Sequence, residues 1–232
     1  MYRCEAVSVS AFVQQLAVSY VSNGYWFYVT GRIPAGKERH LVDQKLIAKY
    51  DIDISKWARA RLRKRGGAAV HYIRYDRFFV LIATRGEHRF FRDEPAFQDI
   101  RRDPIRFAGY SIGYRVGIDG SWHPSVRIHP KHYRRLKAYL AEIASWPSPS
   151  LLRKLSAFPF EPYAPIRRQM LNLLRMINRR RHIAGLEPIP VQCLPLRRRP
   201  RKVFSEGAPL ASDALQDQPR AHEIAELSSR ST

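Results

Sequence analysis

The sequence predicts an α+β fold in two units followed by a tail. Residues 8–84 alternate between helical and strand patterns, residues 106–195 combine a β-hairpin with helices, and the composition changes after Leu196. The chain has 232 residues, 45% of them hydrophobic and 12% aromatic, which is enough to bury one large core or two small ones. We expect two.

The first unit, residues 1–85, begins with a helical pattern over 8–22 that ends at an Asn-Gly pair. Residues 25–30 are aromatic and β-branched and are bounded by glycines, which predicts a strand. Apolar residues then recur at helical spacing over 38–50, which predicts a second helix.

Ser55 is expected to cap a third helix that ends at Gly66-Gly67. We expect its buried side to consist of Trp57, Ala58 and Leu62. Two strands around a tight turn are predicted over 69–74 and 77–84.

The first unit therefore has the order helix, strand, helix, helix, strand, strand. This order resembles the winged helix-turn-helix superfamily over about residues 8–85, as a pattern rather than through any single motif. The resemblance implies that the third helix lies in the major groove of duplex DNA and that the hairpin forms a wing along the adjacent backbone. The alternative is a small α+β domain without a DNA-binding role.

The charge favours a polyanionic partner. Lys and Arg number 41 against 20 Asp and Glu, which gives a net charge of +21. An anionic membrane surface fits less well, because the basic residues are spread over helices, hairpin and tail instead of one amphipathic helix. The third helix concentrates positive charge and has no acidic residue over this stretch: Lys56, Arg59, Arg61, Arg63, Lys64 and Arg65.

Within a recognition helix the early cations reach base edges and the later ones reach phosphates. The resemblance therefore implies that Lys56 and Arg59 read bases, while Arg63 and Lys64 contact phosphates. The hairpin adds three cations that would lie along the backbone or the minor groove. They are Arg74, Arg77 and Arg85.

Residues 86–105 are mixed in charge and predict a linker with one short helix. The second unit, residues 106–195, is expected to hold a β-hairpin, a helix that starts at Pro130 and ends before two prolines, and a long helix over about 163–184. The tail, residues 196–232, is predicted to be disordered. Its basic cluster, which should add affinity for nucleic acid without sequence preference, contains Arg197, Arg198, Arg199, Arg201 and Lys202.

A catalytic alternative comes from Tyr133 and Lys137, whose i, i+4 spacing resembles the Tyr-x-x-x-Lys helix of HUH nicking enzymes. That family holds its metal with a His-x-His motif, which this chain lacks. The acidic residues around Asp93 and Asp99 are expected to form surface ion pairs instead of a metal site. No phosphate-binding glycine loop or paired zinc ligands are present, so we expect no catalytic residue, cofactor or metal.

RNA binding is a second alternative, since aromatic residues could stack on bases if a face of the sheet were uncovered. These residues are Tyr25, Trp26, Tyr72 and Phe79. Only Cys4 and Cys193 are present, far apart, so a disulfide framework is not indicated.

Together, these features predict a protein that contacts duplex DNA. The process would be plasmid or mobile-element replication, or transcription regulation. A cytoplasmic location is expected, with nucleoid association in a bacterium, and no membrane partner. The sequence does not show whether the chain forms a homodimer or which DNA site it binds.

Overall fold

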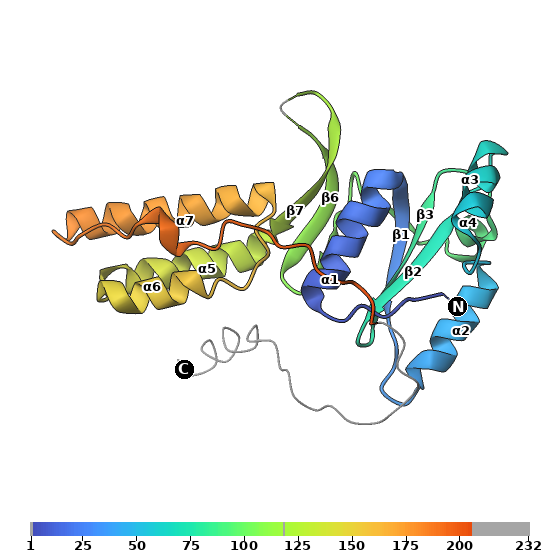
Figure 1. The fold of residues 1–232 in the computed structure, drawn as a ribbon, viewed down its shortest axis with the longest axis horizontal. Helices are drawn as coiled ribbons and strands as arrows, with labels where there is room; N and C mark the ends of the chain where they lie inside the picture. The colour runs from blue at the N-terminus through green and yellow to red at the C-terminus, as the bar shows by residue number, and fades with distance from the viewer. Residues whose placement is uncertain (1, 118, 206–232) are drawn as a thin grey trace.

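A computed structural model describes residues 2–117 and 119–205. The expected α+β class is confirmed. The described chain forms a four-stranded sheet with strand order β2-β3-β1-β4, a three-stranded sheet with order β5-β6-β7, and helices packed around both (Figure 1). No helix in this part of the chain is both long enough and apolar enough to cross a membrane.

The first sheet is antiparallel, with β3 between β2 and β1 and with β4 on the far side of β1. The outer edge of β2 is covered by the N-terminal segment, because Ala6 donates its N–H to the carbonyl of Arg74 and Arg74 donates to the carbonyl of Cys4. The strands are β1 (Tyr25–Arg32), β2 (Val70–Tyr75), β3 (Phe78–Thr84) and β4 (Gln98–Asp99).

One face of this sheet is covered by the first helix. Its α-helical part is α1 (Val9–Gln14), which continues as a π-helix η1 (Gln15–Tyr20) and a 3-10 turn η2 (Val21–Asn23). The hydroxyl of Ser8 accepts the N–H of Ala11 at the start, and Gly24 ends the run with a φ of 87°. Phe12 and Leu16 are fully buried in one core cluster with Val80.

On the opposite side of the sheet lie α2 (Arg39–Lys49), α3 (Lys56–Lys64) and α4 (Arg89–Asp93) (Figure 1), and residues of α2 and α4 cover the face itself. Tyr50 and Phe90 pack there in a second cluster with Tyr72 and Leu81. Since successive strand residues point to opposite faces, Val80 and Leu81 on β3 face the two different clusters. Both faces of the sheet are therefore covered.

The sequence predicts a linker with one short helix for residues 86–105; they contain α4 and β4, and they contribute to both clusters. Phe90 belongs to the second cluster, whereas Ile100 and Ile105 belong to the first. All three side chains are fully buried.

The second unit contains β5 (Ile105–Phe107), β6 (Tyr110–Val116) and β7 (Trp122–Ile128), whose hairpin projects from the body in Figure 1. Its helices are α5 (Pro130–Glu142), η3 (Ile143–Ser145), α6 (Ser148–Ser156), α7 (Ala164–Ile183) and η4 (Val191–Cys193). The sequence does not predict α6, because two prolines after a helical pattern usually indicate the end of a helix. Pro147 and Pro149 instead lie at the start of α6, where proline is well tolerated.

The two units share a core. The cluster beneath α1 runs from Ala6 through Ile112 of β6 to Leu173 of α7. The second cluster joins the first unit to Phe90 of the segment 86–105, on the α2 side of the first sheet. The chain thus has two clusters, but they follow the two faces of the first sheet and not the two units.

Residues 196–205 belong to the folded body. Leu196, Val203 and Phe204 pack against the shared core, and Val7 donates its N–H to the carbonyl of Val203 at 3.0 Å. The prediction of disorder is therefore wrong for these ten positions, because their apolar side chains find a long-range partner in the core. The rest of the predicted tail, residues 206–232, lies outside the described residues.

Candidate nucleic-acid interface

Helix α3 is fixed mainly at its two ends. The hydroxyl of Ser55 accepts the N–H of Ala58 at 3.1 Å, as the sequence predicts for a cap. At the other end Gly66 has a φ of 85° and donates its N–H to Arg63, while Gly67 donates to Leu62. These two bonds form a Schellman motif, which satisfies carbonyls that the helix end leaves free.

The loop after β3 presses against this helix end. Gly86 has a φ of 140°, and a Cβ atom placed there would lie 2.5 Å from the carbonyl carbon of Gly67 and 2.7 Å from the nitrogen of Ala68. Only glycine fits at this position, because any Cβ atom would overlap the backbone of residues 66–68. The position of α3 relative to the sheet therefore depends on Gly86.

The inner side of α3 is formed by Ala58, Arg59 and Leu62, and no residue of the helix is fully buried. Arg59, expected to read bases, instead donates from Nη1 to the carbonyl of Ile54 at 2.5 Å. Its guanidinium group thereby joins the helix to the segment that precedes it. Arg59 is best described as an anchor of α3.

Trp57 was expected on the buried side of α3, and this is wrong: the residue is 76% exposed. At 3.6 residues per turn, Trp57 lies about 100° around the axis from Ala58 and about 140° from Leu62. It therefore points away from the body when Ala58 and Leu62 point inward. Helical spacing places Arg61 and Lys64 on the same outward side as Trp57.

The exposed cations of α3, which we call the α3 basic surface, have no acidic partner among residues 2–117 and 119–205. One of them, Arg63, donates weakly to the carbonyl of Asn23 at 3.4 Å. Cations elsewhere do have partners, as in the pairs of Lys49 with Asp93 and of Arg201 with Glu161. The α3 basic surface consists of Lys56, Arg61, Arg63, Lys64 and Arg65.

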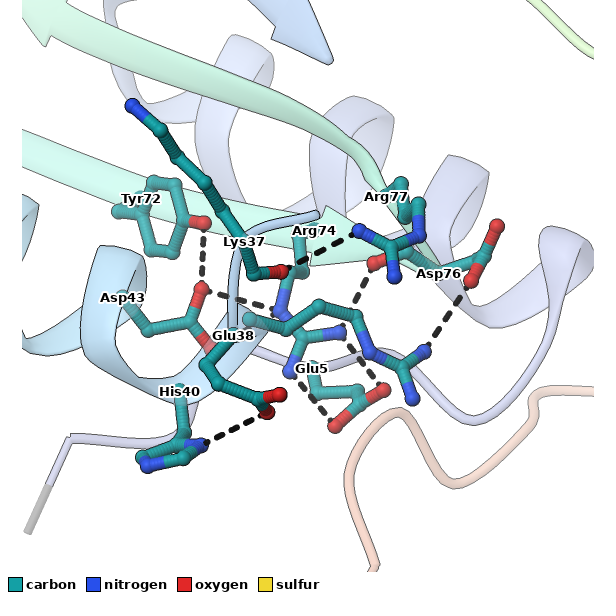
Figure 2. Close-up of polar contacts among 10 residues, drawn as sticks. Glu5, Lys37, Glu38, His40, Asp43, Tyr72, Arg74, Asp76 and Arg77 are labelled. Carbon is teal, nitrogen blue, oxygen red and sulfur yellow. Dashed lines mark hydrogen bonds and ion pairs between the residues drawn. The ribbon is translucent and has the colours of Figure 1, made fainter. Parts of the chain in front are cut away.

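Arg74, expected to contact DNA from the hairpin, is only 4% exposed. Its Nε donates to both carboxylate oxygens of Asp43, at 3.0 and 2.8 Å, and its two Nη atoms donate to Glu5 at 2.7 and 2.8 Å. The hydroxyl of Tyr72 donates to the same Asp43 at 2.6 Å (Figure 2). All three guanidinium nitrogens donate within this buried network, so Arg74 is a structural residue and not a phosphate contact.

Arg77 lies at the hairpin turn, where its Nη1 donates to the carbonyl of Pro34 at 2.6 Å. It also donates to the carbonyl of Lys37 at 3.3 Å (Figure 2). Helix α3 leads into the other end of β2, so the structure does not bring Arg77 together with the α3 basic surface. Arg85, by contrast, is exposed directly after β3 and beside Gly86, at the same end of the sheet as α3.

The predicted tail cations lie in the segment after η4, next to the start of α7. The guanidinium group of Arg198 lies 4.9 Å from the ring of Tyr163, and its Nη1 is buried without a hydrogen-bond partner among the described residues. Arg197 and Arg199 are exposed in the same segment. None of the three has a described contact with α3.

An aromatic cluster lies between the first helix and α3. The ring of His71 stacks on Tyr20 at 4.4 Å and lies 4.8 Å from Tyr25. Burial lowers the pKa of His71 to about 3, and the positive charges of Arg59 and Arg63 act in the same direction. His71 is therefore neutral near pH 7 and adds no charge to the α3 end of the sheet.

These features define a basic, solvent-exposed helix at one end of a two-sheet fold. No family model, curated protein or solved structure matches this chain. The chemistry of the surface is therefore inferred from its own residues.

The residues considered for nicking chemistry have structural contacts. Tyr133 is partly buried against the shared core, and burial raises the pKa of its hydroxyl. The Nδ1 of His129 accepts a backbone N–H at the start of α5, and His123 pairs with Asp119 at 2.9 Å. Within the described ranges, no three His, Cys, Asp or Glu residues are placed so that they could hold a metal ion.

The acidic residues after α4 form ion pairs with nearby cations. Asp99 pairs with Arg101 at 2.5 Å. Burial raises the pKa of the Asp99 carboxyl, but the hydrogen bonds from Arg101 lower it by more. The resulting pKa is below the usual value. Asp93 pairs with Lys49 at 3.4 Å.

The aromatic residues considered for RNA stacking do not form an open surface. Tyr25 and Tyr72 are buried, and Trp26 and Phe79 are half-buried, because helices cover both faces of the sheet. The tryptophans that reach solvent are Trp57, Trp122 and Trp146. The exposure of Trp57 could have been predicted from the sequence only if the buried side of α3 had been assigned to Ala58 and Leu62.

Proposed function

We propose that this protein binds duplex DNA through the α3 basic surface. The observation that carries the proposal is the set of exposed cations on α3 without an acidic partner in the described chain. Like charges crowded on one short helix repel each other, and a polyanion removes that repulsion. Phosphates supply the complementary charge, and each neutralised phosphate releases counterions.

The geometry of α3 favours a duplex. The helix has no fully buried residue and projects at the edge of the fold, and a single α-helix fits the major groove. Lys56 lies at its N-terminal end, from which side chains reach base edges in recognition helices, whereas Lys64 and Arg65 lie at the other end, nearer the phosphates. Arg59 is excluded from base reading because it binds Ile54.

The order of elements and the strand order β2-β3-β1 support a relationship to the winged helix, while the helices on both faces of the sheet differ from it. The proposed contact therefore uses α3 with Arg85 and leaves out the hairpin turn. We propose plasmid or mobile-element replication, or transcription regulation, as the process.

A salt series of binding to duplex DNA tests the proposal. Arg61→Glu combined with Lys64→Glu should weaken binding by at least about 100-fold and reduce the slope of log affinity against log salt by about 2. The matched control is Arg153→Glu combined with Lys154→Glu, two exposed cations of α6 with the same total charge change. In Figure 1, α6 lies at the opposite end of the molecule from α3.

The control should retain most of the affinity. An equal loss in both double variants would show that binding follows net charge and not α3, and the proposal would then be wrong. Single-stranded DNA and structured RNA of equal length complete the series. Tighter binding to either of them than to the duplex would also contradict the proposal.

A further inference from the structure

A tryptophan lies in the first turn of α3, between Lys56 and Arg61 of the α3 basic surface, with no ring contact of its own. Trp57 is 76% exposed, compared with 47% for Trp122 and 42% for Trp146. Trp122 stacks on Tyr114 at 5.6 Å, and Tyr114 stacks in turn on Trp26 at 5.4 Å. One face of Trp122 is thus occupied, whereas no aromatic or cation contact to Trp57 exists among the residues that the structure describes.

The neighbours of Trp57 limit what can cover it. Arg61 and Lys64 follow at i+4 and i+7, about 6 and about 10 Å along the helix axis, and both are exposed. A second copy of this positively charged helix would be repelled. An apolar protein surface would leave the two cations without partners. The fitting partner carries negative charge and flat apolar groups together, and nucleic acid does so because its bases lie between phosphates.

We propose that Trp57 stacks on an unpaired base, so that the protein recognises duplex DNA at a bulged, mismatched or extruded nucleotide. This inference rests on the proposed function and specifies the substrate of the same surface. A fully stacked duplex offers only base edges in its grooves, whereas an indole ring gains most from contact with the face of a base. The face becomes accessible when the nucleotide leaves the stack. Arg61 and Lys64, which both follow Trp57 along the helix, then contact neighbouring phosphates on that side of the base.

The test compares the affinity for a duplex with one unpaired base to the affinity for the fully paired duplex. The wild-type protein should prefer the bulged duplex by about tenfold. Trp57→Ala should reduce this ratio to about one, because stacking is lost while the cations remain. Trp57→Phe should keep most of the preference, since its ring still stacks, and Trp122→Ala should leave the ratio unchanged.

The outcomes separate the two proposals. A Trp57→Ala protein that still prefers the bulged duplex, or a wild-type protein with no preference, overturns the stacking role. The proposed function still stands in both cases if the Arg61→Glu and Lys64→Glu double variant loses duplex binding. Absence of any DNA binding by the wild type overturns both. Because Trp57 is exposed, an unchanged thermal unfolding midpoint for Trp57→Ala shows that the fold is intact.

Discussion

Single arginines in this chain serve different purposes according to the acidic residues that reach them. Arg74 is held by Asp43 and Glu5 in a buried network, whereas Arg61 has exposed surroundings without a described acidic partner. Burial and the hydrogen bond to Asp43 also raise the pKa of the Tyr72 hydroxyl far above its usual value. The network therefore stabilises the fold with Tyr72 protonated, so that its hydroxyl donates to Asp43.

Removal of Asp43 should be strongly destabilising. Asp43→Ala leaves a buried guanidinium group and the Tyr72 hydroxyl without their main partner, and we expect the free energy of unfolding to fall by about 3 kcal/mol or more. Arg39→Ala, which breaks the exposed pair of Arg39 with Asp76, should lower it by less than about 1 kcal/mol. Urea denaturation of both variants measures the difference. Similar losses in the two variants would contradict a structural role for the network.

This contrast explains why residue roles could be predicted only in part. The sequence shows Arg59, Arg61 and Arg74 as equivalent basic residues in or near the first unit. Long-range partners determine the role of each arginine. For Arg74 these partners are Asp43, which is 31 positions away in the sequence, and Glu5, which is 69 positions away. The local density of positive charge predicted the α3 basic surface. It could not show which cations form intramolecular hydrogen bonds and ion pairs.

Helix α3 is an element that depends on its ends, because none of its residues is fully buried. Its cap at Ser55 and its stop at Gly66-Gly67 were readable from the sequence, since capping and glycine stops are local signals. The contact of Gly86 with the residues after α3 was not readable, because it depends on how two loops meet.

Gly86→Ala tests how strongly that contact positions α3. A side chain at 86 requires a strained φ and displaces backbone atoms of residues 66–68, so we expect a loss of about 2 kcal/mol or more in unfolding free energy, with weaker DNA binding. Gly36→Ala is the matched control, because no atom lies within 4 Å of its added Cβ, and it should change stability by about 0.5 kcal/mol or less. Urea denaturation and DNA affinity are measured together. Equal stability of the two variants would show that the loops can separate freely.

Elements with a clear period were predicted closely, whereas the burial of segments without one was not predicted. The strand patterns of β1, β2 and β3 and the long apolar stripe of α7 match the structure closely. Residues 86–105 have no such period, yet Phe90 and Ile100 are buried by contacts with distant elements. Short segments of this kind owe their structure to tertiary packing, which a local pattern does not contain.

At the scale of the whole molecule, one hydrophobic core joins the first sheet, the second sheet and the segment 196–205. The sequence suggested units with separate cores, because the charged stretch 86–105 interrupts the apolar pattern. The packing of Leu196 and Phe204 makes the last described residues part of this core. Their basic neighbours are therefore attached to a fixed backbone.

Two truncations separate the structural role of this segment from its charge. A chain that ends at Pro195 loses the packing of Leu196, Val203 and Phe204, and its unfolding free energy should fall by at least about 2 kcal/mol. A chain that ends at Ser205 keeps every contact described above and should match the full-length protein. Urea denaturation compares the three chains. Equal stability of the two truncated chains would show that the segment adds only charge.

The closure of the chain on itself also determines when it can fold. Gln14 exchanges hydrogen bonds with the backbone of Arg201 across 187 positions, and Val7 bonds to Val203. Loops of this length carry an entropic penalty for closure, and folding rates fall as native contacts become more distant in sequence. On the ribosome, the first helix emerges early but gains these partners only when nearly the whole described chain has been synthesised. The contacts of Val7 and Gln14 therefore form late in synthesis, whereas Phe12 of the first helix can pack against Phe78 of β3 much earlier.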